Sequence, residues 1–460
     1  MLTGLIKKEI VGHVLSLRFV VTFVLSNVLL LTSVLLLSAD YQARLHIHEA
    51  SKAAHRELLT SIKGIEDQDQ WFYDIVIGGG GWYGDRAPQP LSIYVQGLDD
   101  DIPAQVNSSA WGAVRRIDER FYRNPLETLF AAPDYYHIVN IVVSLLSLLF
   151  AFDSICGEKE RGTLKLVLAN AVPRDLVLLS KWIGGYLSLA LPFLMAVLAS
   201  VSYMYFAGTI RLGEGTIERL LWIIAVSLLY VSLFFALGMT ISTLTHKAST
   251  ALLVSLFVWG CWVLIIPNLA SVVAKTVSPT PSLQWLAAEK KAVNRETRIR
   301  RERVQDEKRG EEAAKKMAEI RQDGESRRRR LDTFYRDRRQ QIDLSKNLSR
   351  LSPSASFTYA VTALASTGTG LYSSFRAAYK RFDDEFHDWA GQWYREFRKG
   401  DGKHPDKDWL HADALPSMKL VATPIDDAVS STMTDIVLLL VFNVLLFMLS
   451  YLFFLRYDVT

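Results

Sequence analysis

Cysteine is almost missing from this chain of 460 residues, which contains only Cys156 and Cys261. Two cysteines cannot build a disulfide framework, and the lack of a Cys-x-x-Cys pair excludes a zinc ribbon. The sequence also lacks the Gly-x-x-x-x-Gly-Lys-Ser/Thr loop of nucleotide hydrolases and the His-Glu-x-x-His helix of zinc proteases. We therefore expect no catalytic residue, no metal site and no cofactor in this chain.

A strong charge of one sign is also lacking, because the net charge is only +4. So small a surplus over this length makes no case for nucleic acid as a partner. Half of the residues are nevertheless apolar, while 22% are charged. This mixture predicts apolar blocks in lipid and charged blocks in water.

Six apolar stretches come near the roughly 20 residues that a helix needs to cross a bilayer. Before them, residues 1–18 are predicted to form an amphipathic lead-in helix. The six predicted spans are 19–39, 136–153, 182–207, 218–244, 250–275 and 434–456. The first could instead be a signal peptide, since Lys7, Lys8 and Arg18 precede it and the small residues Ser38 and Ala39 close it.

Basic residues in the short connecting segments indicate the orientation. They lie in residues 1–18, in 154–181, near His246 and Lys247, and at Arg456. All four segments share one side if the six spans alternate, and the positive-inside rule makes that side cytoplasmic. Both termini are then cytoplasmic, and the long blocks 40–135 and 276–433 lie outside.

The sequence thus predicts a mainly α, polytopic membrane protein with two outer blocks. Residues 40–135 read as a smaller mixed α/β segment, with a strand expected at Leu91–Val95. Residues 276–433 read as a helical domain, with a hairpin-like fold between about 282 and 350. After the hairpin, aromatic residues of this domain recur at three- and four-residue steps, as on one helix face. They are Tyr372, Phe375, Tyr379, Phe382, Phe386, Trp389, Trp393 and Phe397. Such a face could pack on the hairpin, lie in the lipid interface or line a substrate route.

The most specific motif follows the second span. It reads Glu158-Lys159-Glu160-Arg161-Gly162-Thr163-Leu164, continues through Leu166 and Leu168, and leads by Pro173-Arg174 into the third span. Gly162 permits a tight turn, and Thr163 can cap the helix that follows. The leucines offer apolar contact, and Glu158 and Glu160 offer carboxylates to basic residues of a partner. The alternative is an ordinary charged loop that obeys the positive-inside rule.

The motif and its flanking spans resemble the permease subunit of type-2 ABC transporters. In that family an acidic-Arg-Gly-Thr-Leu stretch forms a cytoplasmic coupling helix, and a Pro-x-Arg element leads into the next span. The large insert between the last two spans resembles a subgroup related to copper-enzyme-maturation permeases. By this resemblance the ATPase-coupling residues are Glu158, Glu160, Arg161, Gly162, Thr163, Leu164, Leu166, Leu168, Pro173 and Arg174.

The resemblance also implies the assembly and its location. Two copies of a separate ATPase subunit would bind ATP and Mg²⁺, and a second permease copy, identical or a close paralogue, would complete the transporter. The assembly would lie in the inner membrane of a bacterium, surrounded by lipid.

Four polar side chains lie within spans or at their ends, namely Asn27, Asp153, Asn268 and Asn443. Polar groups are costly there and tend to face protein or water, so these residues are candidates for the pathway or the dimer interface. A second functional hypothesis follows from the charged outer block. The ATPase would move the outer helices against a periplasmic partner, and no substrate would cross the bilayer.

Overall fold

A computed structural model of the chain divides it into two compact units. Unit 1 comprises residues 1–257 and 356–460, and unit 2 comprises residues 258–355. The structure describes residues 2–62, 65, 67–108, 133–169, 173–209, 213–282, 284–285, 288, 292, 295, 333–334, 336–400, 402–404, 409 and 415–456.

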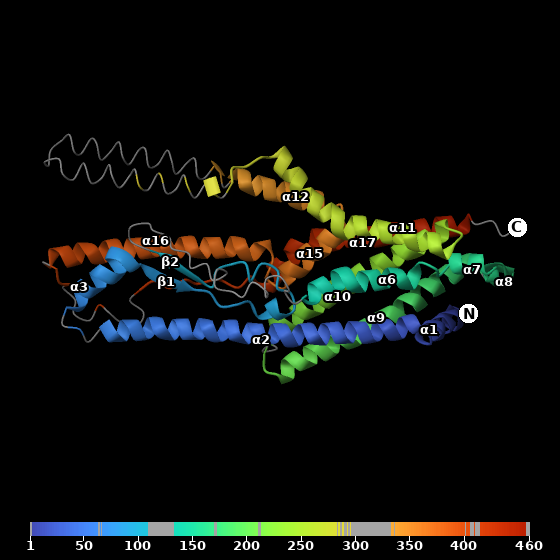
Figure 1. The fold of residues 1–460 in the computed structure, drawn as a ribbon, viewed down its shortest axis with the longest axis horizontal. Coiled ribbons are helices and arrows are strands. Elements are labelled where there is room, and N and C mark those ends of the chain that lie inside the picture. The colour runs from blue at the N-terminus through green and yellow to red at the C-terminus, as the bar shows by residue number, and fades with distance from the viewer. Residues whose placement is uncertain are drawn as a thin grey trace. The chain divides into compact units, whose positions relative to one another are not determined.

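Long apolar helices dominate unit 1 (Figure 1). In chain order its elements are α1 (Leu2–Val14), α2 (Leu17–Ile62), α3 (Gln68–Phe72), the π-helical turn η1 (Tyr73–Gly80), β1 (Trp82–Asp85), the 3-10 turn η2 (Pro90–Ile93), β2 (Gln105–Ser108), α5 (Tyr135–His137), the π-helical turn η4 (Ile138–Val143), α6 (Ser144–Ala151), α7 (Cys156–Glu160), α8 (Thr163–Ala169), α9 (Arg174–Phe206), α10 (Glu214–Leu244), most of α11 (Ala248–Gly260) and of α15 (Pro353–Leu364), α16 (Thr369–Lys399) and α17 (Ile425–Leu455).

The expected spans are present as helices. Within the described residues, six helical segments are long and apolar enough to cross a membrane, with mean hydropathy between 1.9 and 2.7. The fifth begins in unit 1 as α11 and continues in unit 2 as the π-helical turn η5 (Cys261–Ile265) and α12 (Ile266–Val277). The expected lead-in helix is α1. The prediction of a mainly helical polytopic membrane protein is therefore confirmed.

The helix of the first span does not stop at the predicted end of that span. It runs without a break for 46 residues as α2, so it is about 69 Å long at 1.5 Å per residue. The polar stretch beyond Tyr41 contains neither glycine nor proline, and its composition favours helix. α2 packs along α9 through its first half. Its second half belongs to a separate apolar core.

That second core includes the predicted aromatic helix. α16 buries Phe375, Phe382, Phe386, Trp393 and Phe397 against the end of α2, α3, η1 and the strands. The aromatic face therefore packs against protein but, among the described residues, not on the outer hairpin as the sequence suggested. The helix packs on elements of the first outer block, and we call this part of unit 1 (α2 beyond Tyr41, α3, η1, β1, β2 and α16) the distal core.

The strand expected at Leu91–Val95 was wrong. These residues form the 3-10 turn η2 and its continuation, while the strands of the distal core are β1 and β2, paired antiparallel. Leu91, Ile93, Tyr94 and Val95 are all buried, at 4% exposure or less. A half-buried strand would alternate buried and exposed side chains, and this segment has no such alternation.

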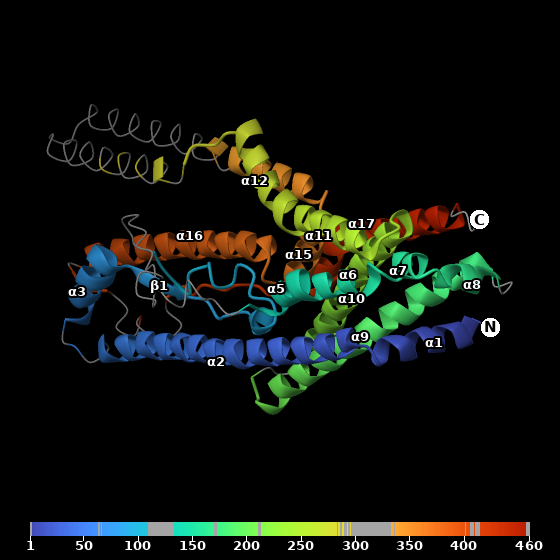
Figure 2. The same ribbon diagram turned by 45° about the vertical axis from the view of Figure 1, so that its right-hand side comes forward.

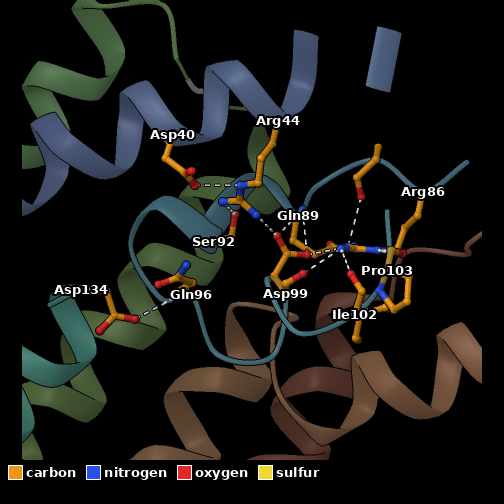
Figure 3. Close-up of polar contacts among 11 residues, drawn as sticks. Asp40, Arg44, Arg86, Gln89, Ser92, Gln96, Asp99, Ile102, Pro103 and Asp134 are labelled. Carbon is orange, nitrogen blue, oxygen red and sulfur yellow. Dashed lines mark hydrogen bonds and ion pairs between the residues drawn. The ribbon is translucent and has the colours of Figure 1, made fainter. Parts of the chain in front are cut away.

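A buried polar network fixes the loop between the strands to α2 (Figure 3). The carboxylate of Asp99 accepts hydrogen bonds from Arg86 Nη1 at 2.6 Å and from Arg44 Nη1 of α2 at 2.9 Å. In the same loop, the backbone N–H of Gln96 donates to Asp134, at 2.8 Å. Asp134 is the N-cap of α5, where the second span begins. One loop thus joins the first span to the second.

A second polar cluster joins α2 to β1. His55 Nδ1 lies 2.8 Å from Asp85 Oδ2, and Ser51 donates to Asp85 Oδ1 at 2.9 Å. Gln105 of β2 donates to the same carboxylate at 3.2 Å. Burial acts to raise the pKa of Asp85, but these hydrogen bonds outweigh it and hold the pKa below its usual value.

Unit 2 is described only in part. Its residues 336–349 are helical, and Gln341 joins them to the segment after α12 by donating to the carbonyl of Ser278 at 2.6 Å. The predicted hairpin between about 282 and 350 lies largely outside the described residues.

Candidate functional site at the basal end of unit 1

Elements far apart in the sequence meet at one end of unit 1. α1, α7, α8 and the last turn of α17 lie there in both views, opposite the distal core (Figures 1 and 2). We call this the basal end. The predicted coupling motif is therefore brought next to the lead-in helix and to the end of the last span.

The motif folds as two short helices joined by a turn. α7 ends at Glu160 and α8 begins at Thr163. Gly162, between them, has φ +74°, a backbone conformation that side chains with a Cβ rarely adopt. The turn expected at Gly162 is thus observed. The hydroxyl of Thr163 donates back to the carbonyl of Glu158 at 3.4 Å, and its expected role as the cap of α8 stays a prediction.

The α7 helix is tied to α10. The hydroxyl of Ser242 accepts hydrogen bonds from the backbone N–H groups of Ile155 and Cys156, at 3.0 and 2.9 Å. These are donors of the first turn, which have no partner within the helix. Lys159 Nζ donates to the carbonyls of Thr243 and Thr245, at 2.5 and 3.3 Å. The last turn of α10 therefore sets the position of α7, a contact that no sequence motif indicated.

Glu158 faces inward, although the sequence suggested that it is offered to a partner. Its Oε1 lies 2.7 Å from Nζ of Lys181 on α9, and the same ammonium lies 3.3 Å from Glu9 of α1. The Lys181 side chain is 6% exposed and each carboxylate side chain 21%. One buried cation thus joins three helices. We call these three residues the Lys181 triad.

Close backbone approach makes the triad feasible. A Cβ added to Gly184, one turn along α9 from Lys181, would lie 2.7 Å from Cβ of Glu9. Only glycine lets α1 lie so near to α9. The sequence contained Lys181 and Glu9 as two charges among many, and only the packing of α1 on α9 shows that they meet.

Glu160 and the residues after it lie at the surface. Glu160 Oε2 accepts from the backbone N–H of Ala248 at the start of α11, at 3.0 Å. Arg161, Gly162 and Thr163 are exposed. Leu164 turns inward and is fully buried, whereas Leu166 is 68% exposed. The backbone of Leu168 belongs to α8, and its side chain lies outside what the structure describes.

The predicted Pro173-Arg174 element begins α9. Pro173 is its N-cap residue, with φ −54° and ψ 132°. Arg174 Nη1 donates to the carbonyl of Leu455 at the end of α17, at 2.8 Å. A cation at a helix C-terminus satisfies a free carbonyl and suits the helix dipole. This contact joins the third span to the sixth.

Asp153, a candidate for the pathway or the dimer interface, forms an ion pair within the chain. Both of its carboxylate oxygens lie 2.7 Å from the guanidinium of Arg18, in a two-point contact. Arg18 also lies over the ring of Phe152, 5.1 Å from its centroid. The pair joins the start of α2 to the end of the second span.

The three asparagines bond to their own helices. The side-chain amide of Asn27 donates to Phe23 and that of Asn268, in unit 2, donates to Leu264. Asn443 donates to Leu439 and also to Leu229 of α10 at 3.0 Å, and its buried Oδ1 has no hydrogen-bond partner among the described residues.

Comparison with known proteins shows the class. A family model described as ABC-2 family transporter protein matches residues 4–459. The chain belongs to this family, and with six apolar helices among its described residues it is a multi-pass membrane protein. The resemblance drawn from the motif is thus confirmed at the level of the family.

Two curated relatives carry more specific names. The probable ABC transporter permease protein NosY of Stutzerimonas stutzeri is 30% identical over 133 residues, and its counterpart in Pseudomonas aeruginosa is 33% identical over 135 residues. Each match covers 28% of this chain and 46% of the relative. The chain thus spans about half the length of the curated relatives it matches.

Proposed function

We propose that this chain is the permease subunit of an ATP-driven transporter and that the α7–α8 segment couples it to a separate ATPase. The chain has no nucleotide-hydrolysis loop of its own, so ATP and Mg²⁺ would be bound by the partner. One observation carries the proposal above the others. The family's motif forms a short exposed helical turn that is bonded directly to α9, α10 and α11, and through Lys181 also to α1.

This arrangement suits the transmission of force. A push on the turn at Gly162 would reach α10 through Ser242 and Lys159, and α9 through Lys181. Arg174 would carry it on to α17. Short, charge-assisted contacts of this kind hold their geometry better than apolar contacts. Under the proposal, the basal end faces the cytoplasm and the distal core lies outside the inner membrane of the cell.

We further propose that two permease copies assemble with two ATPase copies. The support is α17, only 17% of whose apolar window is buried in the chain. Its exposed apolar residues include Val437, Leu440, Val444 and Met448, each at least 46% exposed. Lipid or a second copy would cover this surface, and the symmetric dimer is the commonest assembly of soluble oligomers.

Copurification tests the coupling role. The tagged chain, extracted from its native membranes, should retain an ABC ATPase subunit and stimulate its ATP hydrolysis. Gly162→Trp should reduce that recovery, because tryptophan rarely adopts the φ of +74° that the turn requires and its bulky ring would cover the exposed surface. Gly208→Trp is the matched control, since Gly208 also has a positive φ of +66° and open space around it, but lies at the other end of α9. Equal recovery with both variants would refute the assignment.

A second function has its own support in the structure. Because α2 runs unbroken from the basal end into the distal core, movement of the first span would move the outer elements too. The chain could then act as a mechanical transmitter on a periplasmic partner without moving a substrate. Crosslinking the distal core to the outer part of the spans would distinguish the transmitter from the transporter. If biological function is lost while ATPase stimulation is retained, the transmitter is favoured. If function and ATPase stimulation are both lost, transport is favoured.

A further inference from the structure

The exposed face of the α7–α8 turn is cationic, although the sequence motif is rich in acid. Arg161 and Lys165 are both exposed, on either side of Gly162 and Thr163. Next to them, Leu166 presents 68% of its surface to the outside. We call Arg161, Lys165 and Leu166 the docking tip.

The two carboxylates of the motif are engaged within the chain. Glu158 faces Lys181 at 2.7 Å. Glu160 accepts from the N–H of Ala248, the first residue of α11. The N-terminus of a helix carries a partial positive charge, which offsets part of the carboxylate charge. Arg161 gives one of its five N–H donors to the carbonyl of Gly157, at 3.0 Å, and its charge stays exposed, as does that of Lys165. No acid of the chain lies within an ion-pair distance that would offset these two cations among the described contacts.

The surroundings of the docking tip have the same sign. The exposed cations described in the segments at the basal end are Lys7, Lys8, Arg18, Arg161, Lys165, Lys247 and Arg456, and of these Arg18 is paired with Asp153. Against them stand the exposed acids Glu160, bonded to Ala248, and Asp175 in the first turn of α9. The described part of this surface is thus positive overall.

Resting on the proposed coupling role, we propose that the docking tip binds an acidic groove with an apolar pocket on the ATPase subunit. The cations at the rim would steer the encounter, and Leu166 would enter the pocket. Arginine with an apolar neighbour is typical of protein interfaces, whose cores are otherwise poor in charge.

The shape of the tip favours a protein over a lipid surface as the occupant. The turn is fixed by the positive φ of Gly162, by the buried Leu164 and by the bonds of α7 to Ser242. A lipid surface attracts lysine and arginine without needing such a defined geometry. A groove in a folded partner does need it, because preorganised contacts lose less entropy on binding.

Charge reversal in detergent tests the proposal. We expect Arg161→Glu with Lys165→Glu to lower recovery of the ATPase subunit about tenfold or more, because charges facing an acidic groove now repel it. The matched control is Lys380→Glu with Arg381→Glu, an equal change of charge at exposed positions of α16 in the distal core. The control should leave recovery within about twofold of the unchanged chain.

The sign of the charge effect separates this model from its opposite. A basic groove that reads the carboxylates of the motif would retain as much or more of the ATPase subunit with Arg161→Glu and Lys165→Glu as with the unchanged chain, because the new charges attract it. In that case the proposal fails. It also fails if the docking-tip variant binds normally in detergent and loses the ATPase only in nanodiscs with anionic lipid. If the unchanged chain retains no ATPase, the coupling role itself has failed.

Discussion

Replacing Lys181 with methionine should destabilise the basal end of unit 1. Methionine fills a similar volume but removes the cation shared by Glu9 and Glu158. Removing one partner of a buried ion pair costs about 3–5 kcal/mol, because the remaining charge stays buried and unpaired. The two carboxylate side chains are each 21% exposed, so water relieves part of this cost. We expect about 3 kcal/mol, the lower end of that range.

The assay is thermal unfolding of the purified chain in detergent, followed by tryptophan fluorescence. Lys165→Met provides the matched control, because Lys165 is the same residue type at an exposed position of α8. That change should stay within about 0.5 kcal/mol. Adding Glu9→Gln and Glu158→Gln to Lys181→Met should recover most of the loss, since no charge then remains buried.

Two results would refute the reasoning. In the first, Lys181→Met unfolds at the same temperature as Lys165→Met. In the second, the triple variant is less stable than Lys181→Met alone, which would mean that the carboxylates do not depend on the ammonium. Either result would show that the Lys181 triad does not hold α1, α7 and α9 together.

Three further predictions concern the distal core. Asp85→Asn should lower the free energy of unfolding by roughly 1–3 kcal/mol at neutral pH. The folded chain holds the pKa of Asp85 below its usual value of 3.8. The carboxylate therefore stabilises the fold above pH 3.8, and this stabilisation is lost as the pH falls further. Acid titration of circular dichroism would show a flatter curve for the variant, and identical curves would contradict this. Trp393→Ala should cost about 3–5 kcal/mol because it empties a site at 4% exposure, whereas Tyr372→Ala at 48% exposure should cost little, as denaturant unfolding would measure. Arg86→Met should cost about 3 kcal/mol, since it takes one cation from the buried Asp99; protease resistance of the distal core equal to that of the unchanged chain would be the contrary result.

Sequence reasoning succeeded where the signal is local. A run of about 20 apolar residues is enough to predict a span, and the spacing from Tyr372 to Phe397 is enough to predict one face of α16. The turn at Gly162 was also predictable, because glycine there follows charged residues and precedes a new helical run. In each case the information lies within a few turns of helix.

Contacts between residues far apart in the chain could not be predicted from the sequence. Glu158 and Lys181 are 23 positions apart and Glu9 and Lys181 are 172 apart, so no spacing rule could join them. Ser242, which holds the first turn of α7, is one serine among many in apolar helices. The strand assigned to Leu91–Val95 failed because β-branched residues also fill tight buried turns. For Glu158, the sequence predicted an exposed role, and the fold places the carboxylate inside.

The unbroken α2 makes a rigid lever of the first span. About 69 Å separates its ends, so a tilt of roughly 5° about the basal end would displace Ile62 by about 6 Å at that helical rise. Because Asp99 and Asp134 fasten the interstrand loop to α2 and to the second span, the displacement would be shared by both spans. Under the proposed coupling role, a small movement of the first span at the basal end would thus become a larger one at the distal core.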